Sequence, residues 1–127
     1  MIPNELVDIL DKNGFANVAT IGPDGEPQNN PVWFAWDGET IAISQTPDKQ
    51  KFRNLERDPR AALSILDPDD PYRYLEVRGE VASVEPDPDY AFIHALSNRY
   101  MGQDYPYLQP GEERTIVRIR PLRTTSM

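Results

Sequence analysis

The sequence predicts a mainly β fold with flanking helices, in the form of a small six-stranded antiparallel barrel. Short segments that alternate apolar and polar residues, as half-buried strands do, recur along the chain. Two Asp-Gly pairs, Asp24-Gly25 and Asp37-Gly38, mark tight turns between such segments. The 127 residues show neither an internal repeat nor a linker, so one domain over residues 1–127 is expected.

The first half of the chain is expected to hold two helices and three strands. Leu6, Val7, Ile9 and Leu10 have helical spacing, and Gly14 follows as a stop signal. The segments that come next are strands over 15–21, 27–36 and 40–46, and a helix over 47–57.

The second half is expected to hold three strands and one helix. In order, the segments are a strand over 61–66, a rigid acidic loop over 67–71, a long strand over 72–84, a helix opened by 86–89, a Tyr/Pro/Gly-rich loop over 102–113 and a strand over 114–120. Leu75, Val77 and Val81 share one face of the long strand.

A barrel of this size fills its interior with its own side chains. A flat ligand must then lie outside the barrel or at a subunit interface, so a homodimer is expected. Trp33, Phe34, Tyr72 and Tyr74 also offer more aromatic surface than a monomer normally exposes. Trp33 and Phe34 are neighbours on one strand, so one should enter the barrel and the other should face the ligand or the partner.

The composition argues against several functional classes. The formal net charge is −8, which disfavours a nucleic-acid partner. The chain has no cysteine, which excludes disulfides, thiolate catalysis and cysteine metal sites. No apolar run approaches the roughly 20 residues of a membrane span, and no signal peptide is recognisable. We therefore expect a cytoplasmic protein that binds neither membrane nor nucleic acid.

Cationic residues crowd one short segment of this acidic chain, namely Lys49, Lys51, Arg53, Arg57 and Arg60. Thr46 is expected to cap the helix that begins here, and Pro47 to take its first position. A helix N-terminus beside lysines favours anions, so a small phosphorylated ligand is expected.

The spacing of the two lysines limits how they can act. In a continuous helix Lys49 and Lys51 point about 200° apart. Both reach one anion only if Lys49 lies in the capping turn, and a solvated charged helix is the alternative. Arg53 and Arg57 share one face and are interpreted as surface or interface residues.

No other constellation carries catalytic or metal chemistry, so no catalytic residue and no metal site are assigned. The lone His94 lies beside core positions of a helix, and a structural role is favoured over a role in a pocket. Asp67, Asp69 and Asp70 lack the spacing and closing glutamate of a calcium loop. An ion-paired or solvated strand face is expected for the C-terminal arginines, Arg114, Arg118, Arg120 and Arg123.

Three tyrosines, Tyr100, Tyr105 and Tyr107, flank the loop over 102–113. This loop either packs over the barrel end or forms a substrate-side wall. In the second case the phenols would donate a hydrogen bond to a substrate carbonyl.

Four stretches of the chain carry a family resemblance. They are Ala19-Thr20-Ile21-Gly22-Pro23-Asp24-Gly25-Glu26-Pro27-Gln28 with Pro31-Val32-Trp33-Phe34, Lys49-Gln50-Lys51-Phe52-Arg53-Asn54-Leu55 with Arg57-Asp58-Pro59-Arg60, the stretch over 67–79, and Arg99-Tyr100-Met101-Gly102 with Tyr105-Pro106 and Pro110-Gly111-Glu112. In this order they resemble the split-barrel, FMN-binding-protein-like superfamily of pyridoxamine-phosphate-oxidase-like proteins. Within it they resemble the coenzyme F420 (deazaflavin)-dependent reductases, over about residues 6–121.

The resemblance implies where a cofactor lies. The ring should stack near Asn30 to Trp33, Ser44 and Thr46 should hold the ribityl chain, and Lys49 and Lys51 with Gln50 should hold the phosphate. Tyr72, Arg73 and Tyr74 should close the site from the second subunit of the homodimer. The implied cofactor-binding residues are Gln28, Asn30, Pro31, Val32, Trp33, Ser44, Thr46, Lys49, Gln50, Lys51, Asn54, Tyr72, Arg73 and Tyr74.

The resemblance also implies an activity. Reduced F420 would deliver a hydride to an electron-poor double bond of a small organic substrate, and a proton would come from solvent or a tyrosine. Two alternatives remain open: a flavin reductase or oxidase that binds FMN on the same fold, and a carrier of F420 or flavin without turnover.

Overall fold

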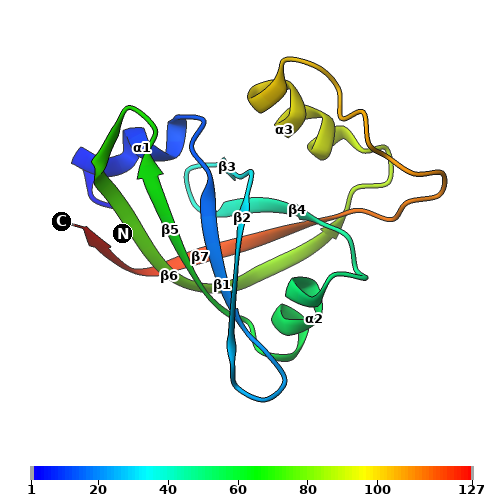
Figure 1. The fold of residues 1–127 in the computed structure, drawn as a ribbon, viewed down its shortest axis with the longest axis horizontal. Coiled ribbons are helices and arrows are strands. Elements are labelled where there is room, and N and C mark those ends of the chain that lie inside the picture. The colour runs from blue at the N-terminus through cyan, green and yellow to red at the C-terminus, as the bar shows by residue number, and fades with distance from the viewer. Residues whose placement is uncertain (1, 127) are drawn as a thin grey trace.

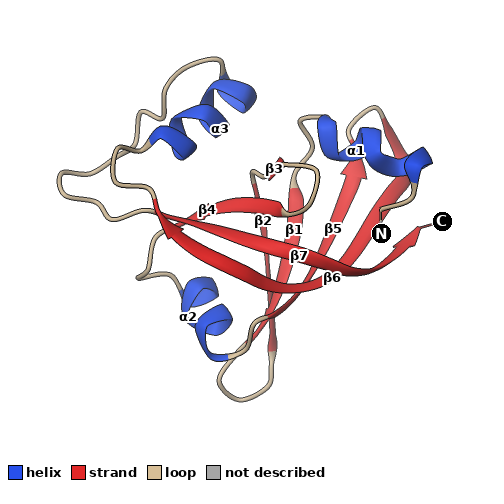
Figure 2. Ribbon diagram, turned by 180° about the vertical axis from the view of Figure 1, so that it is seen from behind, coloured by secondary structure: helices blue, strands red, loops and turns tan. Residues whose placement is uncertain are grey.

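The computed structural model describes residues 2–126. Its elements in chain order are the 3₁₀ helix η1 (Asn4–Leu6), α1 (Val7–Asp11), β1 (Ala16–Ile21), β2 (Pro27–Val32), β3 (Ala35–Trp36), β4 (Ile41–Gln45), α2 (Gln50–Arg57), β5 (Arg60–Asp67), β6 (Asp70–Pro86), α3 (Ala91–Met101) and β7 (Thr115–Ser126). The strands form one antiparallel sheet that curls into an open half-barrel (Figure 1). The three α-helices lie around this sheet, and α3 stands apart from it (Figure 2).

The prediction of six strands is wrong, because residues 2–126 contain seven. The segment expected as one strand over 27–36 is divided: Val32 in β2 pairs with Ala16 in β1, whereas Ala35 in β3 pairs with Ala42 in β4. β2 and β3 are thus the two ends of the sheet order β2-β1-β5-β6-β7-β4-β3. The chain crosses from one edge of the sheet to the other within Trp33 and Phe34, where it must change its pairing partner.

The other predicted strands are confirmed, with longer bounds near the C-terminus. β6 and β7 extend beyond the predicted segments because they pair with each other along most of their length, from Leu75 opposite Ser126 to Pro86 opposite Thr115. Both predicted Asp-Gly turns are present, and Gly25 and Gly38 have positive φ values of 85° and 95°. Such values favour glycine over residues with a Cβ atom.

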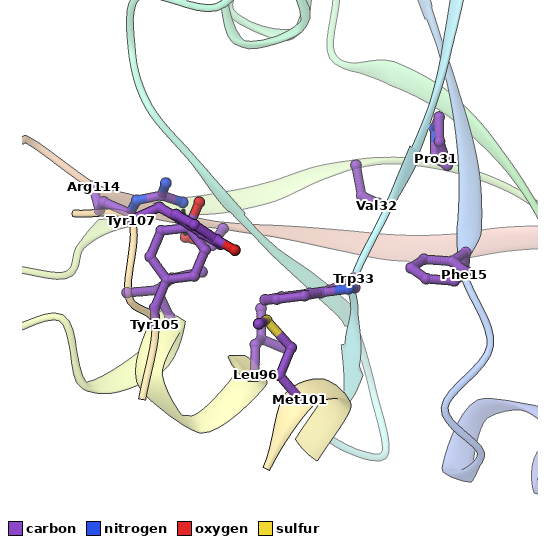
Figure 3. A pocket seen from close by; sticks show the side chains of 11 residues that line it. Phe15, Pro31, Val32, Trp33, Leu96, Met101, Tyr105, Tyr107 and Arg114 are labelled. Carbon is purple, nitrogen blue, oxygen red and sulfur yellow. Dashed lines mark hydrogen bonds between the residues drawn. The ribbon is translucent and has the colours of Figure 1, made fainter. Parts of the chain in front are cut away.

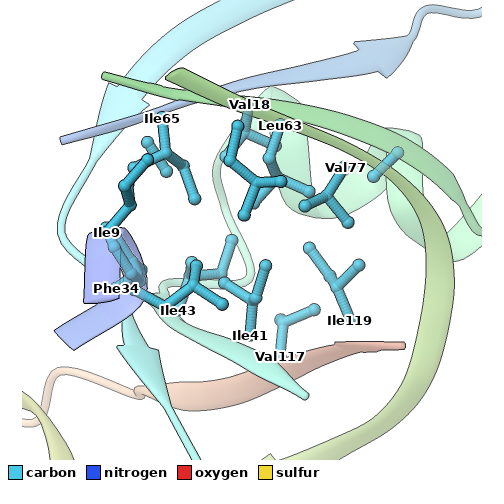
Figure 4. Close-up of a cluster of buried hydrophobic side chains, with 14 of the residues drawn as sticks. Ile9, Val18, Phe34, Ile41, Ile43, Leu63, Ile65, Val77, Val117 and Ile119 are labelled. Carbon is cyan, nitrogen blue, oxygen red and sulfur yellow. The ribbon is translucent and has the colours of Figure 1, made fainter. Parts of the chain in front are cut away.

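The concave side of the sheet is filled with apolar side chains (Figure 4). The largest fully buried ones are Phe34, Ile9, Leu10, Ile41, Ile43, Leu63, Ile65, Leu75, Ile119, Val18, Val77 and Val117. Burial of each such side chain contributes about 1.5–3 kcal/mol. The interior is therefore occupied by the protein itself, as a barrel of this size requires.

Helix α2 begins later than the sequence suggests. The expected start at Pro47 with a Thr46 cap is wrong: the helix starts at Gln50, and its N-cap residue Lys49 makes no side-chain cap hydrogen bond. A separate turn precedes it, in which the Lys49 N–H donates to the Thr46 carbonyl over 3.2 Å. Because Lys49 has extended backbone angles, it lies in the capping turn, the place from which both lysines can serve one anion.

Helix α3 is held at both ends by side chains. The buried carboxylate of Asp87 accepts hydrogen bonds from the N–H groups of Phe92 and Ile93 at the first turn. Near the last turn, Arg99 donates to the carbonyls of Leu10 and Lys12. These bonds fix α3 beside the rim of the half-barrel although it packs little against the sheet.

The acidic turn between β5 and β6 is tied to α1. Asp67 accepts hydrogen bonds from Lys12 at 2.8 Å and from Arg73 at 2.8 Å. Lys12 also pairs with Asp69, and Arg73 with Asp8. Two of the three aspartates considered for calcium, Asp67 and Asp69, are therefore part of an ion-pair cluster, and Asp70 accepts a hydrogen bond from the Tyr72 N–H. None of the helices within residues 2–126 is long and apolar enough to cross a membrane.

Candidate functional site

A hollow of about 370 Å³, here called the cationic hollow, opens where β2, β4 and the start of α2 meet. Its lining residues are Gln28, Asn30, Ser44, Gln45, Thr46, Lys49, Gln50, Lys51 and Arg114. Strand alternation presents Gln28 and Asn30 on one face of β2, and the turn before α2 adds Thr46 and Lys49. The fold thus brings together all five residues to which the resemblance gives ribityl or phosphate binding, namely Ser44, Thr46, Lys49, Gln50 and Lys51.

Lys51 is the unusual charge of the cationic hollow. The residue is only 8% exposed, and no carboxylate among residues 2–126 lies within ion-pair distance of its ammonium. Burial lowers the pKa of Lys51, and the positive charge of Lys49 lowers it further. A buried charge without a partner is unfavourable, so the hollow suits an anionic group that supplies the missing counter-charge.

Thr46 supports the same interpretation from the opposite wall. Its Oγ1 atom is buried and has no hydrogen-bond partner of normal geometry among the described residues, although it lies close enough to the Asp48 carboxylate to lower the pKa of that group. Buried hydroxyl groups are normally hydrogen-bonded. An oxygen-rich ligand in the hollow would satisfy Thr46 and Lys51 together, and a phosphate attached to a hydroxylated chain fits both.

Asn54 lies behind the cationic hollow rather than in its lining. It is fully buried, and its amide group donates to Thr20 Oγ1 and to Gln28 Oε1, each over 3.0 Å. Its carbonyl oxygen accepts a hydrogen bond of 2.8 Å from Gln50 Nε2. Asn54 therefore positions Gln28 and Gln50, which do line the hollow.

A second hollow of about 460 Å³, here called the apolar hollow, lies between the sheet and α3 (Figure 3). Its lining residues are Phe15, Pro31, Val32, Trp33, Ser44, Ile93, Leu96, Met101, Tyr105, Tyr107 and Arg114. The question that the sequence left open for Trp33 and Phe34 is resolved, because Phe34 is buried in the core and Trp33 lines this hollow.

Aromatic contacts hold the wall of the apolar hollow. The rings of Trp33 and Tyr100 stack at 5.3 Å with an interplanar angle of 9°, and Tyr105 meets Trp33 edge-on at 6.1 Å. Tyr100 donates its hydroxyl hydrogen to the Gly14 carbonyl over 2.6 Å, and burial raises the pKa of Tyr100. Tyr100 is thus a fixed support rather than a free acid.

The loop after α3 supplies the outer wall. His94 Nδ1 accepts a hydrogen bond of 2.9 Å from the Tyr105 N–H, which gives the lone histidine a structural contact that anchors this loop. Tyr105 and Tyr107 both line the apolar hollow, and their hydroxyl groups have no hydrogen-bond partner within the described chain. The two tyrosines thus lie where a substrate-side wall would need them, and that alternative stays a prediction.

Ser44 and Arg114 line both hollows, so the two are neighbours, and we call the pair the groove. Sequence reasoning missed Arg114, because it placed this residue on an ion-paired strand face. The expected ion pairs are present, since Arg118 pairs with Glu85 and Asp37 and Arg114 pairs with Glu112. Arg114 lines the hollows in addition. The one sequence signal for a site role of Arg114 was its position directly after the tyrosine-rich loop over 102–113, which was itself a candidate wall of the site.

Tyr72, Arg73 and Tyr74 lie at the start of β6 and line neither hollow of their own chain. Tyr72 is 80% exposed, and Arg73 is paired with Asp8 and Asp67. Their expected action across a dimer interface stays a prediction. Residues 2–126 contain no group of three or more histidine, aspartate or glutamate side chains arranged to hold a metal.

Solved structures of known proteins share this architecture. A protein described as an F420 reductase is 41% identical, with 98% of each chain covered and a TM-score of 0.91. A conserved hypothetical protein of Mycobacterium tuberculosis is 29% identical, with 99% of this chain and 84% of that chain covered and a TM-score of 0.78.

A curated relative matches a part of the chain. It is the 5a,11a-dehydrotetracycline/5a,11a-dehydrooxytetracycline reductase of Streptomyces rimosus, 35% identical over 65 residues. The match spans 48% of this chain and about half, 46%, of the length of that relative. The sequence profile of the family described as pyridoxamine 5'-phosphate oxidase matches residues 2–127. The chain therefore belongs to this family.

Proposed function

We propose that this member of the pyridoxamine 5'-phosphate oxidase family is an F420-dependent reductase that acts on a small organic substrate. The observation that carries the proposal is the buried Lys51, which lacks a counter-charge within residues 2–126, at one end of a groove whose other end is walled by Trp33. A ligand with a phosphate at one end and a flat ring at the other matches both ends. Two similar proteins described as an F420 reductase and a dehydrotetracycline reductase support the same activity.

The phosphate or phosphodiester of the coenzyme would bind at the cationic hollow. Lys51 and Lys49 supply charge, and the first N–H groups of α2 point into the same region. Lysine acts as a point charge without the fork of a guanidinium group, so the two lysines share the phosphate oxygens. Ser44 and Thr46 offer hydroxyl groups to the ribityl chain, which gives the unsatisfied Thr46 Oγ1 a partner.

The ring would lie in the apolar hollow, against Pro31, Val32 and Trp33 and beside Asn30. Apolar walls on the β2 side and on the α3 side exclude water from the ring faces. Reduced F420, when bound, supplies a hydride for an electron-poor double bond such as that of a conjugated enone or quinone. The chain contributes position and a dry environment.

Tyr105 and Tyr107 are proposed to contact the substrate. Their hydroxyl groups can donate a hydrogen bond to a substrate carbonyl and so increase the electron demand of the conjugated double bond. The proton that completes the reduction comes from one of these hydroxyl groups or from solvent. Tyr100 is excluded from this role because its hydroxyl hydrogen is donated to Gly14.

Parallel fluorescence titrations of the purified protein with F420 and FMN test the proposal. Tight F420 binding and weak FMN binding are expected, followed by oxidation of reduced F420 in the presence of enones or quinones. The absence of micromolar affinity for F420 would refute the proposal. Tight binding without oxidation of the reduced coenzyme by any acceptor would indicate a carrier.

One observation favours FMN as a second candidate cofactor. A third hollow adjoins the cationic hollow, and its lining residues are Thr46, Pro47, Asp48, Lys49, Tyr105, Tyr107, Gln109, Glu112, Glu113 and Arg114. Its three carboxylates outnumber its two cations, Lys49 and Arg114, and Arg114 is already paired with Glu112. This balance disfavours a polyanionic tail such as the oligoglutamate of F420, whereas FMN ends at one phosphate. Tight binding of FMN and weak binding of F420 in the same titrations would indicate a flavin reductase or oxidase instead.

A further inference from the structure

Arg114 occupies a special place in the groove, because it lines all three hollows. It is the residue immediately before β7, and its side chain is 13% exposed. A ligand whose ring lies in the apolar hollow and whose phosphate lies in the cationic hollow must pass this guanidinium group. Arg114 is therefore placed at the middle of the ligand rather than at either end.

Three contacts fix the guanidinium group at this junction. Its Nε donates to a Glu112 carboxylate oxygen over 2.6 Å, and its Nη1 donates to Ser44 Oγ over 3.1 Å. Its central carbon lies 4.9 Å from the centre of the Tyr105 ring, a distance at which a cation and an aromatic face attract. Arginine has five N–H donors, so donors remain that bond to nothing among the described residues.

We propose that Arg114 is the residue that binds the middle of the ligand, through an oxygen atom of the chain that links ring and phosphate. This inference rests on the proposed function. A guanidinium group only donates hydrogen bonds, so the partner must be an acceptor, and the hydroxyl oxygens are the acceptors that the chain between ring and phosphate offers. The terminal phosphate is left to Lys49 and Lys51.

Glu112 and Ser44 act as positioning residues for Arg114. Glu112 fixes the plane of the guanidinium group through Nε, and Ser44 holds Nη1 at the rim shared by the two hollows. Lysine cannot reproduce this arrangement, because a single ammonium group cannot bond Glu112, Ser44 and a ligand in a fixed plane. If only arginine supports full affinity, Arg114 binds through directed hydrogen bonds, because a general attraction between charges would be met by lysine as well.

Fluorescence titration with two probes tests the inference. The probes are F420 and its phosphate-free fragment, 8-hydroxy-5-deazariboflavin. Arg114→Gln is expected to weaken binding of both probes by the same factor, roughly 10- to 100-fold, the range for loss of a charged hydrogen bond. Lys51→Met is expected to weaken binding of F420 and to leave binding of the fragment unchanged. Arg114→Lys should recover only part of the loss, and Glu112→Gln should cause a smaller loss than Arg114→Gln.

The matched control is Arg118→Gln, because Arg118 lies in β7 close to Arg114 in the chain, pairs with acids and lines none of the three hollows. It should bind both probes as the wild type does, and thermal unfolding of each variant checks that it folds. If the wild type binds the fragment too weakly to measure, F420 is titrated into the double variant, which carries both Arg114→Gln and Lys51→Met, and its affinity is compared with those of the two single variants. The two losses are expected to multiply, because the side chains contact different groups.

The outcomes separate this inference from the proposed function. If the wild type binds neither F420 nor FMN, the proposed function fails. If the wild type binds F420 and folded Arg114→Gln binds it equally well, only the role of Arg114 is overturned. If Arg114→Gln weakens binding of F420 but not of the fragment, Arg114 binds the phosphate and the inference is overturned. The same holds if the double variant binds F420 no more weakly than Lys51→Met alone.

Discussion

At the scale of single residues, Lys49 and Lys51 differ in the property that matters most for binding an anion. Lys49 is exposed at the N-cap of α2, whereas Lys51 is 8% exposed in the first turn. Water screens an exposed ammonium group strongly and a largely buried one much less. Lys51 should therefore contribute the larger share of the binding free energy.

Replacing Lys51 by Ala should weaken cofactor binding by roughly 1–3 kcal/mol, because a charged hydrogen bond is lost. Lys49→Ala, at the exposed position, should weaken it less. Unchanged affinity of Lys51→Ala in a fluorescence titration would mean that the phosphate binds elsewhere.

The affinity should also depend on pH through Lys51. Burial lowers the pKa of the free Lys51 ammonium, and a bound anion raises it, so binding takes up a proton whenever the free lysine is neutral. Affinity should then fall as the pH rises through the pKa of the free form. Lys51→Arg should flatten this dependence, because a guanidinium group stays protonated; the same pH profile for both proteins would contradict the argument.

Asn54 matters through the groups that it holds. Asn54→Ala leaves Thr20 and Gln28 without their partner inside the protein, which should lower the free energy of unfolding by about 1–3 kcal/mol. The control Asn29→Ala changes an exposed asparagine on β2 and should stay within about 0.5 kcal/mol of the wild type. Urea unfolding measures both, and equal stability of the two variants would rule out the supporting role.

At the scale of elements, the turn between β5 and β6 depends on one carboxylate. The hydrogen bond from Lys12, together with the Asp69 N–H and Arg73, lowers the pKa of Asp67 from 3.8 to about 2. Its stabilising effect is therefore fully present above pH 3.8 and is lost as the pH falls through about 2. This turn joins α1 to the sheet, so its loss should loosen that end of the half-barrel.

Asp67→Asn tests this dependence by chemical unfolding at a series of pH values. The variant should be less stable than the wild type at neutral pH, and the difference should shrink as the pH falls from about 4 to about 2. Asp69→Asn is the matched control, because its side chain is 76% exposed and its pair with Lys12 is screened. A stability difference that is constant with pH would show that the ionisation of Asp67 does not matter.

At the scale of the whole molecule, the outer face carries apolar side chains that the described chain does not cover. They include Leu66 at 47%, Tyr72 at 80% and Leu122 at 47% exposure. Contiguous exposed apolar surface often marks an interface. We predict a homodimer in which Tyr72, Arg73 and Tyr74 of one subunit approach the groove of the other.

Light scattering of the purified protein should give twice the mass of the chain. Tyr72→Ser should weaken cofactor binding although Tyr72 lines neither hollow of its own subunit, because the second subunit would lose part of its closing wall. Val84→Ser, at the far end of β6, is the matched control and should bind as the wild type does. A monomeric wild type with full affinity for the cofactor would contradict the dimer prediction.

The sequence by itself determined the features that depend on neighbouring residues. Asp-Gly pairs require particular turns, alternation requires strands, and the pair of lysines after β4 indicates an anion site, because each signal is local. The same local signals, with the family resemblance, placed Trp33 and Lys51 in the groove.

Only the tertiary structure decided what depends on distant partners. The division of 27–36 into β2 and β3 follows from pairing with β1 on one side and β4 on the other, which no local signal encodes. Arg114 enters the site because it bonds Ser44, a residue 70 positions away. The physical reason in each case is that hydrogen bonds between distant segments, rather than local preference, choose the partner.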